Sequence, residues 1–174
     1  VQPALEVHSF SSRSPDEPLA NADPAVITAR LRAQAFEALD PQALVPFFAD
    51  PHEPLRRLAV EQLRALVRSR SAQHGSDSQP VQDLLHALLP WLETPTQPHA
   101  AETTAVFLDG LGDPAQVLCR ALLGQVQPSP GALGWACSYA AQIGDEDLLP
   151  LLLRHSQHPK ATSRAAVMAA LVSL

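Results

Sequence analysis

Prolines recur along this chain at the starts of segments with helical periodicity, and they constrain the fold more than any other feature. The best-defined example is residues 46–66, PFFADPHEPLRRLAVEQLRAL, where a short apolar stretch is followed by Asp50-Pro51 and a longer amphipathic segment. Proline in the first turn of a helix costs little, because the N–H that it lacks would have no partner there. Most of the 17 prolines therefore mark helix starts rather than helix breaks, and the sequence predicts an all-α fold.

The pattern of turn and helix appears four times. The turn prolines of the four copies are Pro51, Pro95, Pro128 and Pro159. The steps between them are 44, 33 and 31 residues, and Arg56 aligns with Arg164 at an offset of 108 residues. A period of about 30 to 45 residues with two helices in each unit is typical of a helical solenoid.

We predict a single domain over residues 23–174, with an N-terminal capping helix that begins at Asp23-Pro24 and then four helix pairs. The pairs span about residues 40–68, 80–112, 113–144 and 145–174. Each pair leaves an apolar stripe uncovered, so the pairs are expected to stack as a right-handed α-solenoid. Residues 1–22 lack helical periodicity and indicate an extended leader. Residues 69–80 are polar and aperiodic, so we expect a long loop there.

Charge and hydropathy limit the classes of partner. Twelve Lys and Arg against 18 Asp and Glu give a formal net charge of −6, whereas proteins that bind nucleic acid usually present a basic surface. No apolar run approaches the roughly 20 residues that cross a bilayer. We therefore expect neither a nucleic-acid nor a membrane partner.

Cysteine usage favours a cytoplasmic protein. Cys119 and Cys137 are too few for a disulfide framework, and both lie on apolar helical stripes. Buried thiols are expected, with a disulfide between paired helices as the alternative. A removed secretion signal is the alternative for location, since the sequence begins at Val1 rather than Met.

Residues suited to catalysis or metal binding are few. His155 and His158 lie on neighbouring turns, but no carboxylate or cysteine ligand accompanies them in the sequence. Asp145, Glu146 and Asp147 suit the positive end of a helix dipole better than acid-base chemistry. The sequence contains no nucleophile elbow, phosphate-binding loop or dinucleotide-binding fingerprint. We predict no catalytic residue, no metal site and no cofactor.

The best-defined turn combines Asp50-Pro51 with Leu55, Arg56 and Ala59, and two unit junctions share a pattern, Leu111-Gly112-Asp113-Pro114 and Ile143-Gly144-Asp145. Over roughly residues 40 to 174 this pattern resembles the HEAT-like repeat superfamily, especially the short bacterial units first noted in phycobilisome lyases. We expect Arg56 to pair with Asp50 at its own turn. Because other residues replace the turn Asp and the arginine in the middle repeats, no continuous Asp-Arg ladder is expected.

For function we expect a non-enzymatic scaffold or adaptor whose stacked second helices present a groove to a protein or peptide partner. The outward candidates on those helices are Arg57, Glu61, Arg64, Arg68, Glu102 and Asp109. The resemblance implies two alternatives: a bilin chromophore lyase or its accessory subunit and, less favoured because of the negative charge, a DNA glycosylase. Apolar residues in the last helix lead us to expect self-association there, or continuation of the solenoid.

Overall fold

The computed structural model describes residues 44–93 and 98–174, together with Ala25 and Ala29. Every regular element in this part of the chain is a helix, which confirms the all-α prediction. The predicted leader, most of the predicted capping helix and the turn at Pro95 lie outside the described residues.

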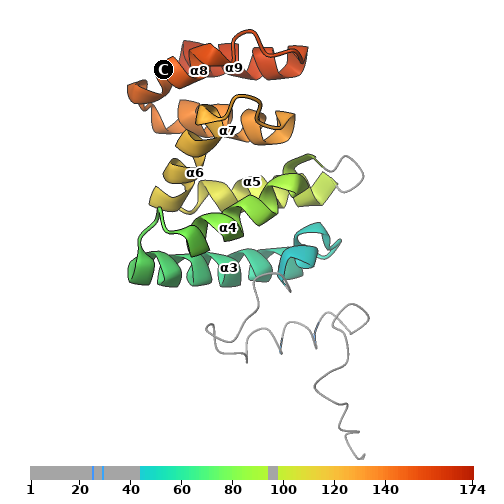
Figure 1. Cartoon of the computed structure of the whole chain (residues 1–174). Coiled ribbons are helices and arrows are strands. Elements are labelled where there is room, and N and C mark those ends of the chain that lie inside the picture. The colour runs from blue at the N-terminus through green and yellow to red at the C-terminus, as the bar shows by residue number, and fades with distance from the viewer. Residues whose placement is uncertain (1–24, 26–28, 30–43, 94–97) are drawn as a thin grey trace, which may run out of the picture.

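The helices follow one another with short turns between them, and η denotes a 3-10 helix. In chain order they are η3 (Val45–Ala49), α3 (Glu53–His74), α4 (Gln79–Leu88), η4 (Leu89–Glu93), α5 (Pro98–Asp109), α6 (Asp113–Gly124), α7 (Pro130–Ile143), η5 (Glu146–Leu148), α8 (Leu149–Arg154) and α9 (Ala161–Ser173). Figure 1 shows them stacked, with α3 at one end and α8 and α9 at the other.

Proline and glycine delimit many of these helices, as the sequence predicts. Prolines occupy the first turns of α3, α4, α6, α7 and α8; they are Pro54, Pro80, Pro114, Pro130 and Pro150. Gly144 ends α7 with a φ of 65°, a left-handed conformation that glycine adopts without strain. The helix boundaries are thus set by local backbone chemistry.

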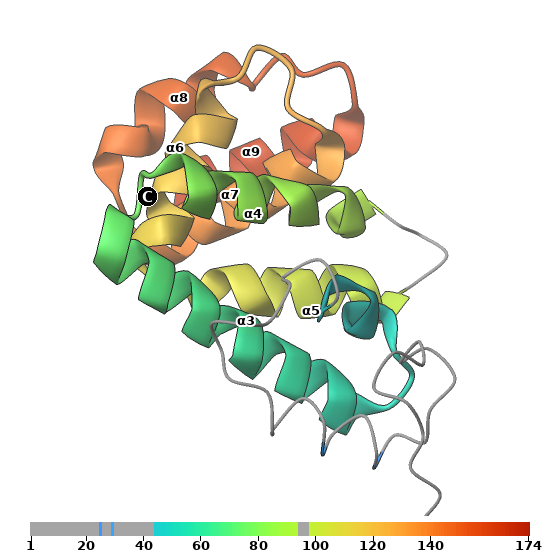
Figure 2. The ribbon, with the colours of Figure 1, turned by 60° about the horizontal axis from the view of Figure 1, so that its bottom comes forward.

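The described helices pack in two layers. In one layer α4 contacts α6, and α6 contacts α8; in the other α3 contacts α5, and α7 contacts α9. Contacts between η3 and α3, α6 and α7, and α8 and α9 join the layers. Figure 2, turned from the view of Figure 1, shows α3 and α5 side by side.

One cluster of buried apolar side chains extends through the described helices. Phe48 of η3 and Phe107 of α5 are fully buried, and their ring centroids lie 5.6 Å apart. These rings come from consecutive predicted pairs, so their contact joins one pair to the next. Burying a side chain of this size contributes about 1.5–3 kcal/mol, and this contact therefore contributes to the stability of the fold.

The long loop predicted for residues 69–80 is wrong. Helix α3 continues to His74 and α4 begins at Gln79, so only residues 75–78 separate them. Adding a residue to an existing helix costs far less than starting one, so a polar segment can extend α3 without an apolar stripe of its own. Gly75, with a φ of 92°, follows the last helical residue.

Candidate partner-binding groove

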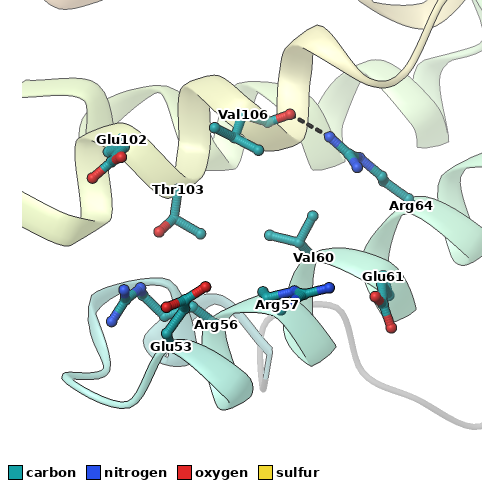
Figure 3. A pocket seen from close by; sticks show the side chains of 9 residues that line it. All are labelled: Glu53, Arg56, Arg57, Val60, Glu61, Arg64, Glu102, Thr103 and Val106. Atoms are coloured by element: carbon teal, nitrogen blue, oxygen red, sulfur yellow. Dashed lines mark hydrogen bonds between the residues drawn. The ribbon is translucent and has the colours of Figure 1, made fainter.

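A groove open to solvent lies between α3 and α5, with a volume of about 540 Å³. Its lining residues are Glu53, Arg56, Arg57, Val60, Glu61 and Arg64 from α3 and Glu102, Thr103 and Val106 from α5 (Figure 3). Residues three and four positions apart share one face of a helix, and this spacing aligns Arg57, Glu61 and Arg64. Packing of α3 beside α5 then places the two faces opposite each other.

Four of the six predicted partner-binding residues line this groove: Arg57, Glu61, Arg64 and Glu102. Arg68 is exposed on α3, one turn beyond Arg64, and Asp109 is the last residue of α5. Neither lines the groove. The structure therefore brings the central candidates together and leaves these two outside.

Arg64 also has a structural role. Its Nε donates to the carbonyl oxygen of Phe107 at 3.4 Å, and its Nη2 donates to that of Val106. Carbonyl oxygens in the last turn of a helix have no partner within the helix, so Arg64 caps α5 from the neighbouring α3. Burial, followed by the nearby charge of Arg68, lowers the pKa of Arg64.

Asp109 likewise makes an internal contact. Its Oδ1 accepts a hydrogen bond of 2.9 Å from the indole N–H of Trp135 on α7. Trp135 stacks on Tyr139, with ring centroids 5.3 Å apart, and the Tyr139 hydroxyl donates to the carbonyl oxygen of Gly112 at 3.3 Å. Asp109 thus ties the end of α5 to α7.

The guanidinium of Arg56 contacts main-chain atoms, and not the carboxylate, of the turn at Asp50. Its Nη1 donates to the carbonyl oxygens of Asp50 at 2.7 Å and Pro51 at 3.0 Å. The Asp50 carboxylate is used differently, since Oδ1 accepts the main-chain N–H of His52 at 2.8 Å. The contact between Arg56 and this turn therefore does not require a carboxylate.

Sequence reasoning did not single out the apolar part of the groove. Val60 is 6% exposed and Thr103 is 8% exposed, whereas Val106 is 52% exposed, which is unusual for a valine on a packed helix. Residue spacing in the sequence indicates that Val106 belongs to this surface. Val106 lies four residues after Glu102, so the two share a face of α5. This face combines a charged side chain with an accessible apolar one.

The two histidines at the end of α8 have separate hydrogen-bond partners. His155 is buried, and its Nε2 lies 2.9 Å from the carbonyl oxygen of Leu123. Nδ1 of His158 accepts the main-chain N–H of Lys160 at 3.2 Å. Within the described ranges, no group of three or more potential ligands is arranged to hold a metal ion.

Both cysteines are buried free thiols. Burial raises the pKa of Cys119 to about 12 and that of Cys137 to about 11. A thiol with such a pKa is protonated at neutral pH and is a poor nucleophile. The Cys119 thiol donates to the carbonyl oxygen of Ala136 on α7 at 3.4 Å.

No known protein family, curated protein or solved structure matches this chain. Over residues 44–93 and 98–174, no helix has both the length and the hydropathy to span a membrane.

Proposed function

We propose that the protein is a non-enzymatic interaction scaffold, a right-handed HEAT-like α-solenoid in which the groove between α3 and α5 binds a protein or peptide. The observation that carries this proposal is Val106, a branched apolar side chain 52% exposed in a groove whose other lining residues are largely charged. An apolar centre with a polar rim is the usual anatomy of a protein-binding surface.

A repeated turn contact supports the HEAT-like part of the proposal. Nη1 of Arg164 donates to the carbonyl oxygens of His158 at 2.8 Å and Pro159 at 2.9 Å. This reproduces the contact of Arg56 with its own turn. The two arginines occupy equivalent positions in the first and last predicted pairs, as expected for copies of one structural unit.

The charges of the groove favour a protein over DNA. Glu53, Glu61 and Glu102 offset the three arginines that line it, so the groove lacks the excess of positive charge that binds a phosphate backbone. A peptide offers both apolar side chains for Val106 and polar groups for the rim.

Panning a random peptide library tests this function. The full chain is panned in parallel with Val106→Asn, which replaces an exposed apolar side chain by a polar one of similar size. The matched control is Val172→Asn on α9, where the valine is 84% exposed and outside the groove. We expect selected peptides to bind Val106→Asn at least about tenfold more weakly and to bind Val172→Asn as well as the unmodified chain.

Two outcomes would contradict the proposal. One is a selected set that binds both variants equally, since the groove would then not be the site. The other is turnover of a small molecule by the purified protein without any selected peptide. Circular dichroism of the two variants establishes that each is folded.

A further inference from the structure

Three arginines and three glutamates line the groove, and their hydrogen-bonding capacity is used unequally. Arg56 and Arg64 donate to main-chain carbonyl oxygens, at the turn after η3 and in the last turn of α5. Carbonyl groups at a helix C-terminus carry a partial negative charge. The fold itself therefore offsets part of these two positive charges.

Arg57 is the third arginine. On α3 it lies four residues after Glu53 and four before Glu61, a spacing at which opposite charges attract. Glu102 adds a carboxylate from the facing helix α5 (Figure 3). Within the described part of the chain, none of the three glutamates has a hydrogen-bond or ion-pair partner. Three carboxylates of the groove are thus without such a partner, against one guanidinium, that of Arg57.

Apolar surface lies among these carboxylates. Val106 of α5 is 52% exposed and supplies most of it, and Val60 of α3, which is 6% exposed, faces Val106 across the groove (Figure 3). Lysine and arginine side chains cover apolar surface with their methylene stems while their charged ends stay near polar groups. Their shape and charge match the valines and the surrounding carboxylates together.

We infer that the groove binds an extended segment of a partner protein that carries lysine or arginine, with the stem on Val106 and the cationic end among Glu53, Glu61 and Glu102. This inference rests on the proposed function and specifies the chemistry of its ligand. The net charge of −6 also favours a ligand with lysine or arginine, because it attracts a cationic partner at long range.

The length of the groove limits the size of the segment. From Glu53 to Arg64 is 11 steps along α3, and at about 1.5 Å per residue this is about 16 Å. An extended chain covers that length with about five residues. A short peptide is therefore enough to test the inference.

The first experiment compares three fluorescein-labelled peptides by anisotropy with the full chain. One peptide alternates leucine and lysine, and the other two replace every lysine with glutamate or with glutamine. We expect the lysine peptide to bind at least about tenfold more tightly than the glutamate peptide, with an affinity that falls as salt screens the charges. Equal binding, or tighter binding of the glutamate peptide, would overturn the inference.

The second experiment locates the contact with isosteric variants. Glu102→Gln removes one groove carboxylate without changing its size, and we expect it to weaken the lysine peptide by about three- to tenfold. Glu146→Gln on η5 is the matched control, since Glu146 is an exposed acid outside the groove. An equal loss in the control would mean that net charge alone attracts the peptide, and the inference would be wrong.

The inference and the proposed function fail in different ways. If library peptides that depend on Val106 are acidic or uncharged, the groove binds proteins but the basic ligand is wrong. If no library peptide depends on Val106, the proposed function is wrong, and the inference, which rests on it, is wrong as well.

Discussion

Arg56 and Arg164 make the same contact in two turns at opposite ends of the described helices. In each case Nη1 donates to two consecutive carbonyl oxygens, those of the residue before the turn proline and of the proline itself. The acceptor residues are Asp50 and Pro51 in one turn and His158 and Pro159 in the other, at distances of 2.7 to 3.0 Å. Because the acceptors are main-chain atoms, the residue before the proline is free to differ between turns.

Replacing Arg56 by lysine tests this contact. Lysine keeps the charge but lacks the planar guanidinium, so we expect Arg56→Lys to lower the free energy of unfolding by about 1–2 kcal/mol. Asp50→Ala removes only the carboxylate that accepts the His52 N–H, and we expect a smaller loss of about 0.5–1 kcal/mol. Urea denaturation measures both changes. A larger loss in Asp50→Ala would show that the carboxylate, and not the carbonyl, stabilises the turn.

The sequence predicted the turns at Pro51, Pro128 and Pro159 but not which atoms stabilise them. Proline position and helical periodicity depend on local backbone chemistry, which the residues at Asp50-Pro51 display directly. The sequence specifies side chains, so it predicts that Arg56 pairs with Asp50. Every residue has a main-chain carbonyl group, and a contact with that group therefore cannot be recognised from the type of residue. For the same reason Arg164 makes this contact although the residue before its turn proline is His158 and not an aspartate.

The guanidinium of Arg64 lies close to Gly110, and a second prediction follows from this contact. A Cβ at Gly110 would overlap the Arg64 guanidinium, so Gly110→Ala is expected to displace it from the Val106 carbonyl and to cost about 1 kcal/mol of stability. Gly110 has no positive φ, so in an Arg64→Ala background the same change is expected to be neutral or to stabilise by up to about 0.5 kcal/mol. Denaturation of the four proteins forms a double-mutant cycle. Equal costs in both backgrounds would show that the arginine is not the obstacle.

The sequence grouped Arg64 and Asp109 with the partner-binding residues because helical periodicity identifies which side chains share a face. It does not show which other helix lies against that face. The acceptors of Arg64 are 42 and 43 residues away along the chain, and the donor to Asp109 is 26 residues away. Only the tertiary packing of α3, α5 and α7 brings these atoms together.

Asp109 is expected to act on stability rather than on peptide binding. Asp109→Ala leaves the largely buried indole N–H of Trp135 without its acceptor, and we expect a loss of about 1–2 kcal/mol in the free energy of unfolding. Tryptophan fluorescence during urea denaturation measures it. Because Asp109 does not line the groove, affinity for the lysine peptide should stay unchanged. A weakened peptide with unchanged stability would instead make Asp109 a partner-binding residue.

The contact between Arg120 and Asp145 makes part of the stability depend on pH. Asp145 Oδ2 accepts from Arg120 Nη2 at 2.7 Å, and chiefly this hydrogen bond lowers the pKa of Asp145 below its ordinary value of 3.8. A carboxyl group whose pKa is lower in the folded state stabilises the fold above its unfolded pKa, and this contribution disappears as pH falls through the folded pKa. The loss is therefore expected below about pH 4.

Arg120→Gln removes the main cause of that pKa shift. We expect its thermal midpoint to lie below that of the unmodified chain at neutral pH, and the difference to shrink steadily below about pH 4, as both proteins come to carry a protonated Asp145. Arg154→Gln is the matched control, since it removes an exposed arginine at the end of α8 and leaves the hydrogen bond to Asp145 in place. A difference between Arg120→Gln and the unmodified chain that stays constant from neutral to acidic pH would show that Arg120 stabilises the fold through something other than ionised Asp145.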